Sequence, residues 1–91
     1  FYPFYLSQHA KRSCRRLHFL GTTLGLAAAV AAVITRNPWW LAAGLATGYA
    51  AAWIGHFFFE KNKPATFTHP IYSFMGDWLM WRDMLTGRIK F

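Results

Sequence analysis

Two long stretches without a charged residue constrain the fold of this chain more than any other feature. They run from Phe19 to Thr35 and from Trp39 to Phe59, which is 17 and 21 residues. As α-helices they would be about 25 and 31 Å long, against a hydrocarbon core of about 30 Å in a bilayer. Only Arg36-Asn37-Pro38 separates them, which suits a tight antiparallel turn. We therefore predict an all-α membrane protein with a two-helix transmembrane hairpin, its spans at 18–36 and 39–60.

The composition agrees with a membrane location and excludes several other classes of protein. Charged residues make up 14% of the chain, whereas a soluble domain has about 25%. The ten Lys and Arg residues outnumber the three acidic ones, but they flank the apolar stretches instead of lining a polar face. We therefore expect no nucleic-acid partner. No phosphate-binding glycine loop occurs, and the single cysteine excludes an intrachain disulfide.

The positions of the cations predict the orientation of the hairpin. Four lie just before the first apolar stretch and two just after the second, while Arg36 alone occupies the turn. Because cytoplasmic loops are enriched in Lys and Arg, both termini are expected in the cytoplasm. Trp39 and Trp40 would then lie at the opposite interface.

The segments outside the spans are expected to lie along the membrane surface. In the C-terminal segment 61–91, apolar residues recur at steps of three and four between Pro70 and Thr86, which predicts an amphipathic interfacial helix. The N-terminal segment 1–17 is expected to hold a weaker helix of the same kind. We expect these segments and both spans to form a single membrane domain, residues 1–91.

Two histidines occupy matching positions in the hairpin. His18 and His56 lie 19 residues before and 19 residues after Asn37, so an antiparallel hairpin places them at the same depth. A stripe of small residues at four-residue steps, including Gly44 and Gly48, leads to His56 and allows close helix contact. Both imidazoles are therefore expected to face the seam between the helices.

The other two histidines flank the spans on the same side. His9 and His69 can join His18 and His56 if the terminal segments fold back, and for His9 this requires a break in the helix near Ser13. Imidazole is a good ligand for iron, zinc, copper and nickel. We therefore predict a metal site with His9, His18, His56 and His69 as ligands. The alternative for each is an ordinary interfacial histidine.

Glu60 is the only acidic residue close to the spans, one helical turn beyond His56. We predict it as the catalytic carboxylate, either as a further metal ligand or as the group that orients a ligating imidazole. The alternative is an ion pair with Arg15, Arg16, Lys61 or Lys63.

Several motifs resemble those of a known family. The segment from Gly55 to Ala65 has the pattern GHxxFExxxPA, and Tyr5 to His9, Arg16 to Thr22, Pro64 to Phe67 and His69-Pro70 add further matches. The chain thereby resembles the short bacterial branch of a family of small membrane proteins related to the fungal 2-hydroxy fatty acid dioxygenase. The resemblance covers nearly the whole chain, although the chain is shorter than the fungal enzymes and lacks their further membrane helices.

The resemblance implies an iron(II)-dependent oxygenase that uses dioxygen to shorten a 2-hydroxy fatty acid by one carbon. His9, His18 and His56 match family histidines, and His69 matches the bacterial pattern. If the activity holds, Arg16, Lys61 or Lys63 would hold the substrate head group. The expected location is a bacterial inner membrane.

Two other classes of function fit the same residues. Paired histidines on antiparallel helices can ligate a haem or chlorin, and exposed stripes of small residues suit an accessory subunit of a larger membrane complex or a homo-oligomer. Optical absorption and native mass would distinguish these alternatives.

Overall fold

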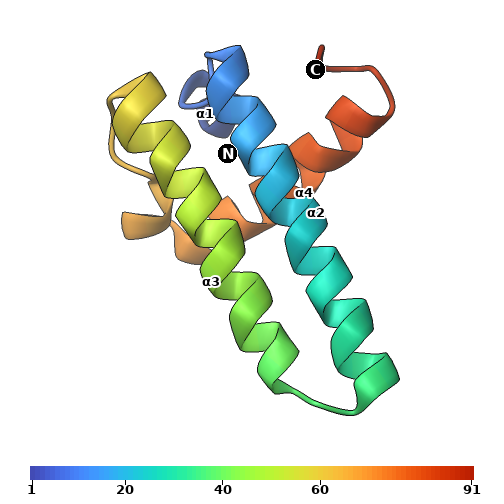
Figure 1. Ribbon diagram of the computed structural model, residues 1–91. Helices are drawn as coiled ribbons and strands as arrows, with labels where there is room; N and C mark the ends of the chain where they lie inside the picture. The colour runs from blue at the N-terminus through green and yellow to red at the C-terminus, as the bar shows by residue number, and fades with distance from the viewer.

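The computed structural model describes residues 1–91 and consists entirely of helices (Figure 1). The α-helices are α1 (Tyr2–Ser7), α2 (Arg12–Thr35), α3 (Trp39–Ile54) and α4 (Pro70–Leu85). A π-helix, η1 (Gly55–Glu60), continues α3, and a short 3-10 helix, η2 (Ala65–Phe67), precedes α4. The predicted all-α architecture is therefore confirmed.

Helices α2 and α3 form the predicted antiparallel hairpin, and Figure 1 shows the turn between them at the end of the molecule far from both termini. Arg36 adopts a left-handed conformation with φ of 54° and ends α2. Asn37 then stabilises the turn, because its side-chain oxygen accepts a hydrogen bond of 3.1 Å from the backbone N–H of Trp39.

Small residues allow the two long helices to pack closely, as the sequence predicts. A Cβ atom added at Gly21 would lie 2.8 Å from the carbonyl oxygen of Gly48. A Cβ atom at Gly44 would lie 2.7 Å from the Cβ of Ala28. These distances are too short for side chains, so glycine is required where the backbones approach each other.

Only α2 is long and apolar enough by itself to cross a membrane. Its 24 residues correspond to about 36 Å. Helix α3 has 16 residues before the backbone widens into η1, so the two-helix transmembrane hairpin stays a prediction. Large apolar side chains near the turn, including Val33, Ile34 and Trp39, are exposed. Such a surface is typical of contact with lipid or with a partner.

The first long helix begins earlier than the sequence suggests. Residues 12–17 belong to α2, although we assigned them to the N-terminal surface segment. Arg12, Arg15 and Arg16 lie just before the apolar stretch. Arginine is a good helix former, so the helix continues through these charged residues, although the apolar stretch does not. The α3 and η1 helices together cover residues 39–60, the bounds of the second predicted span.

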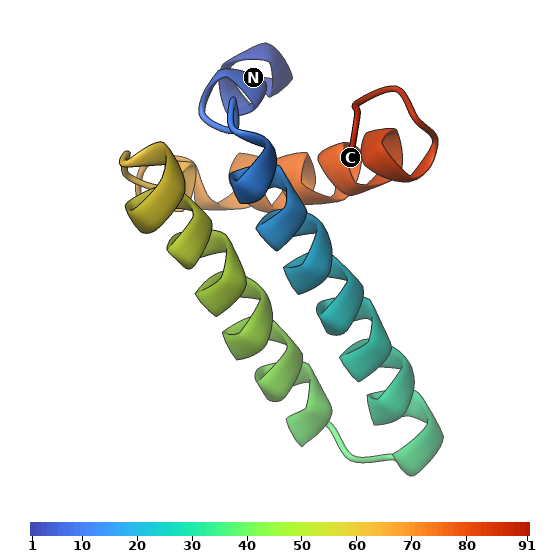
Figure 2. The same cartoon turned by 45° about the horizontal axis from the view of Figure 1, so that its top comes forward.

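Helix α4 crosses the hairpin at the end that carries both termini (Figure 2). Its bounds agree with the predicted C-terminal helix, but its apolar residues are divided between the protein interior and the exposed surface. Ser73, Gly76 and Met80 are buried, whereas Ile71 and Met75 are exposed. An outward apolar face is what a helix at a membrane interface requires.

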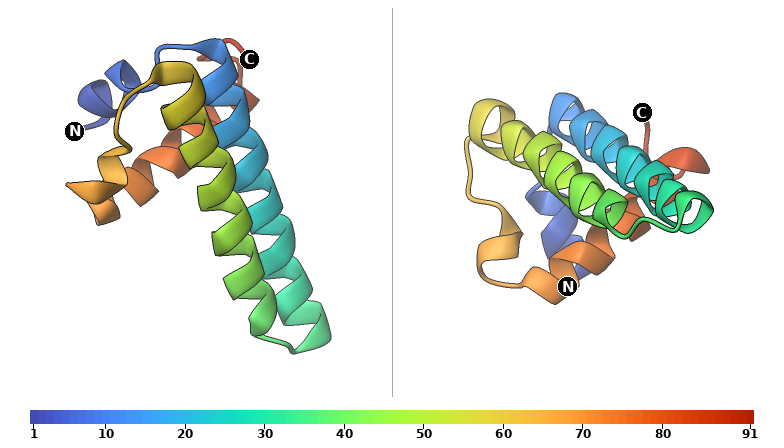
Figure 3. Two further views of the ribbon diagram at one scale, coloured as in Figure 1. Left: turned by 60° about the vertical axis from the view of Figure 1, so that its left-hand side comes forward. Right: turned by 60° about the horizontal axis from the view of Figure 1, so that its bottom comes forward.

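Helix α1 packs against α4 through a small core on one side of the hairpin (Figure 3). The ring of Tyr5 lies directly over Gly76, where an added Cβ would approach ring atoms to 2.7 Å. Met80 and Met84 complete this core. The hydroxyl of Tyr5 also donates a hydrogen bond to Asp77. These contacts fix the position of α1 and of the histidine that follows it.

Candidate metal centre

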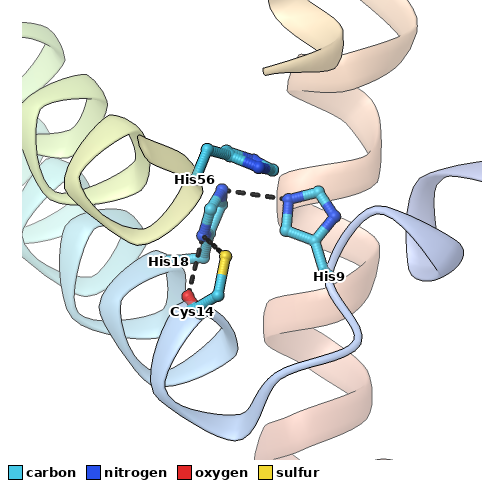
Figure 4. A group of neighbouring side chains, drawn as sticks. All are labelled: His9, Cys14, His18 and His56. Atoms are coloured by element: carbon cyan, nitrogen blue, oxygen red, sulfur yellow. Dashed lines mark hydrogen bonds between the residues drawn. The ribbon is translucent and has the colours of Figure 1, made fainter. Parts of the chain in front are cut away.

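Three histidines from three separate segments meet inside the end of the molecule that carries the termini (Figure 4). His9 lies in the connection between α1 and α2, His18 in α2, and His56 in η1. The ring centroids are 4.3 Å apart for His9 and His18, 4.5 Å for His9 and His56, and 4.8 Å for His18 and His56. All three side chains are buried. The predicted convergence of these three residues is therefore present in the structure.

His9 reaches the cluster because the chain is not helical between α1 and α2. The break lies between Ser7 and Arg12, a few residues before the expected position at Ser13. Lys11 has an extended backbone there, and its N–H donates a hydrogen bond of 2.5 Å to Glu60. This contact joins the start of α2 to the end of η1.

His18 and His56 lie opposite each other where α2 and η1 approach closely. A Cβ atom added at Gly55 would lie 3.0 Å from Sγ of Cys14, so glycine permits this contact. The π-helix then ends at Lys61, which has a left-handed φ of 58°. Single turns of π-helix are rare and occur frequently at functional sites.

The Nδ1 atom of each of the three histidines is held by an oxygen acceptor. Nδ1–H of His9 donates to the carbonyl oxygen of Tyr5 at 2.6 Å, and that of His18 to the carbonyl oxygen of Cys14 at 2.9 Å. Nδ1–H of His56 donates to the side-chain oxygen of Asn62 at 2.7 Å. Each proton is therefore on Nδ1, which leaves the Nε2 lone pair free for a metal ion.

The orientation of the Asn62 amide is set by its own donors. Its NH₂ group donates to the backbone and side-chain oxygens of Gln8, at 3.1 and 3.2 Å. The amide oxygen must therefore face His56. Asn62 thus connects the segment before His9 to the imidazole of His56.

The spacing of the Nε2 atoms suits a metal ion. Those of His9 and His18 are 3.0 Å apart. Two nitrogens that each lie about 2.1 Å from one ion, at a right angle, are separated by about 3 Å. Without a cation or a shared proton, the two lone pairs would repel each other. The donor atoms of the three histidines and Cys14 all lie within 4.8 Å of one another, close enough to hold a metal ion.

Electrostatics keep His9 in the form that binds metals. Burial, and next the nearby His18, lower the pKa of His9 to about 2. Its imidazole is therefore neutral at physiological pH, as a metal ligand must be.

His69 lies away from the cluster. It immediately precedes α4, is exposed, and its ring centroid is 5.3 Å from that of Phe1. Its Nδ1 contacts the hydroxyl of Thr68 at 2.9 Å. The structure thus brings together three of the four histidines that we predicted as ligands, and the fourth donor of the cluster is Cys14.

Glu60 lies beside the cluster but is not one of the grouped donors. It accepts the hydrogen bond from the backbone of Lys11, at the start of α2, where a negative charge also favours the positive end of the helix dipole. The alternative for Glu60, an ion pair with a nearby cation, is absent, since the only salt bridge joins Arg82 and Asp83.

The three cations predicted to hold the head group are exposed and separate from the histidines. The guanidinium of Arg16 donates a hydrogen bond of 2.8 Å to the carbonyl oxygen of Phe91 and stacks on its ring. Lys61 and Lys63 follow η1 on the surface.

Three polar residues at the site were not assigned to it from the sequence. Cys14 precedes His18 by one helical turn, a spacing that could have suggested it. Asn62 belongs to the GHxxFExxxPA segment but lies in an irregular loop, where periodicity gives no direction. Asp77 lies in α4, far from the histidines in the sequence, yet it accepts a hydrogen bond from Tyr5 and lines a cavity beside His18.

Comparison with known proteins identifies the family. Neither the curated proteins nor the solved structures contain a significant match to this chain. A family model described as "2-hydroxy-palmitic acid dioxygenase Mpo1-like" matches residues 1–89. This match covers almost the entire chain, including all three histidines of the cluster. The chain therefore belongs to the Mpo1-like family.

Proposed function

We propose that this protein is an iron(II)-dependent dioxygenase that oxidises a 2-hydroxy fatty acid at a membrane. The observation that carries the proposal is the convergence of three buried imidazoles, from His9, His18 and His56, whose donor atoms lie within 4.8 Å of one another. The family description supplies the reaction class and the kind of substrate. The exposed apolar side chains of α2 and α4 suit a substrate that is itself dissolved in lipid.

The proposed reaction shortens the acid by one carbon. The 2-hydroxy acid and one molecule of dioxygen become the shorter fatty acid, carbon dioxide and water, and dioxygen takes up the four electrons released. Bound iron(II) supplies the redox chemistry that allows dioxygen to react with the substrate.

The residues of the chain hold the ligands in place and limit access of water. Tyr5, Cys14 and Asn62 accept the Nδ1 protons, so each imidazole has a fixed orientation. His9, His18 and His56 would hold the iron(II), a set of three protein ligands that resembles the one non-haem iron oxygenases use. Glu60 acts in this proposal by fixing Lys11, and thereby the connection that carries His9.

We further propose that the site faces the cytoplasm of a bacterial inner membrane, with both termini on that side. Lys61 and Lys63 would then attract the substrate carboxylate at the membrane surface. Their exposure and their place directly after η1 support this role.

The geometry favours a small ion over a haem or chlorin. Axial imidazoles lie on opposite faces of a macrocycle, whereas three rings of this cluster meet edge to face around one point. Ring centroids within 4.8 Å of one another leave no slot for a flat cofactor between them. A colourless preparation without a Soret band is the expected result.

The test is product formation by protein purified without oxygen and loaded with iron(II). On addition of 2-hydroxypalmitate and air, mass spectrometry should detect the fatty acid with one carbon less. His56→Ala should abolish the product, and His69→Ala, which changes a histidine outside the cluster, should retain it. Equal product from both variants, or none from the unmodified protein with iron bound, would contradict the proposal.

A further inference from the structure

A narrow cavity of about 280 Å³ lies between α2, α3 and α4 and begins at the histidine cluster. His18 belongs to the cluster and also lines the cavity. Helix α4 contributes Phe74, Asp77 and Trp78 to the lining. The volume is slightly below the usual range of about 300 to 1,000 Å³ for small-molecule sites.

The cavity is polar at one end and apolar at the other. His18, Thr22 and Asp77 lie at the end near the cluster, and the far end near the turn is lined by Ala29 and Leu41. His18 and Ala29 are eleven residues apart in α2, which corresponds to about 16 Å along the helix. Tyr49 also lines the cavity, and the remaining lining is largely apolar or glycine, which suits an acid with an alkyl chain.

The cavity exists because small residues leave space beside the helix contact. Gly21 and Gly44 are in tight contact with the opposite helix, so they determine how closely α2 and α3 approach. Gly25 differs, since a Cβ atom added there would have its nearest neighbour at 3.8 Å. The absence of a side chain at Gly25 therefore leaves room between the helices and α4.

We infer that this cavity, which is open along part of its length, binds the alkyl chain of the 2-hydroxy fatty acid, and that the side chains at its far end, Ala29 and Leu41, limit the chain length accepted. The inference rests on the proposed function for the identity of the head group. The inference is supported by His18, which belongs both to the histidine cluster and to the cavity lining. If the carboxylate and hydroxyl of the acid lie at the histidines, its alkyl chain can follow the cavity along the seam between α2 and α3.

The first test compares two identical substitutions at similar distances from the turn. Ala29→Leu adds a side chain to the far end of the cavity, whereas Ala46→Leu adds it to an exposed position of α3 outside the cavity. With 2-hydroxypalmitate and 2-hydroxylaurate in competition, Ala29→Leu should lower the preference for the longer acid by about tenfold or more. Ala46→Leu should leave the preference unchanged. The same preference in both variants would overturn the inference.

The second test measures binding without metal and without turnover. Palmitate labelled with bromine on its chain should quench the fluorescence of Trp78 in the metal-free protein in nanodiscs of unlabelled phosphatidylcholine. The quenching should be largely lost in Trp78→Phe, and Ala29→Leu should weaken it. Quenching of Trp78 by brominated phosphatidylcholine, unaffected by added palmitate, would instead assign the cavity to a bilayer lipid and overturn the inference.

These two tests separate the cavity from the chemistry. If the labelled acid quenches Trp78 but the iron-loaded protein forms no product, binding of the alkyl chain in the cavity is supported and the proposed function is contradicted. Product formation with no effect of Ala29→Leu on chain length would support the function and contradict the cavity.

Discussion

Hydrogen bonds at Nδ1 determine what His9, His18 and His56 can do. Two of the acceptors are backbone carbonyls, which single substitutions do not remove, but the third is the side chain of Asn62. Asn62 is therefore the one point at which the orientation of a ligand can be changed without altering the ligand or the backbone.

Asn62→Ala should lower the affinity for iron(II) by about 10-fold to 100-fold, because the imidazole of His56 loses the acceptor that orients it. Anaerobic titration with iron(II) measures this affinity. Asn37→Ala, the same substitution in the distant turn, is the control and should leave the affinity unchanged. Equal affinities for both variants would show that Asn62 does not position His56.

Asp77 should make the stability of the protein depend on pH. Burial raises the pKa of this carboxyl group from its usual 3.8 to about 6, while the hydrogen bond from Tyr5 opposes the rise. The folded state therefore binds its proton more tightly than the unfolded state. The stabilisation that the protonated Asp77 adds to the free energy of unfolding is fully present below about pH 4. It is lost as pH rises through 6.

The loss should be at most about 3 kcal/mol, which corresponds to the difference between the two pKa values. Denaturant unfolding at a series of pH values between 4 and 7 measures it. Asp77→Asn carries no titrating proton, so the decline across this range should become smaller. An unchanged pH profile in the variant would contradict the assignment of the decline to Asp77.

The sequence located the ligands in the helices better than those in the loops. Matched distances from Asn37 were enough to place His18 and His56 together, because a helical hairpin has a regular rise. His69 follows a connection from Lys61 to Thr68 that contains only the short η2, and no periodicity in the sequence determines its path. The position of Asn62 was unpredictable for the same reason.

The contact between α2 and α3 tolerates added volume at some glycines and not at others. Gly21→Ala would place a Cβ atom 2.8 Å from the backbone oxygen of Gly48, so the helices must separate. Overpacking of this kind costs about 1–3 kcal/mol. Gly25→Ala has its nearest neighbour at 3.8 Å and also gains helix propensity, so it should be neutral or slightly stabilising. Unfolding measurements on this matched pair check the packing, and equal destabilisation would contradict it.

Helix α4 shows why amphipathicity alone does not predict the packed face. Its periodic apolar residues identified the helix correctly, but the face that contacts the protein carries Ser73, Gly76 and Asp83 beside Met80 and Met84. Small and polar residues are needed there because Tyr5 packs on Gly76 and Tyr2 donates a hydrogen bond of 2.7 Å to Asp83. Ile71, Met75 and Leu85 remain exposed, whereas Phe74 and Trp78 line the cavity and Trp81 stacks on Phe19. The exposed apolar residues fit a helix in a membrane interface.

The molecule as a whole separates an apolar rod from a polar end. The hairpin extends from the turn toward the termini, and α1, α4 and all three clustered histidines lie at the end with the termini (Figures 1 and 4). The metal cluster is thus formed where segments from both halves of the chain meet. The apolar stretches predicted the rod, and the histidine spacing predicted which end carries the site.

The stoichiometry of iron binding in the histidine variants tests the central claim most directly. Anaerobic titration of the unmodified chain should give one iron(II) per chain. His9→Ala, His18→Ala and His56→Ala should each lose most of this binding, because each removes one of three converging imidazole donors. His69→Ala should bind iron as the unmodified chain does. Unchanged iron binding in the first three variants would contradict the metal centre, and with it the proposed chemistry.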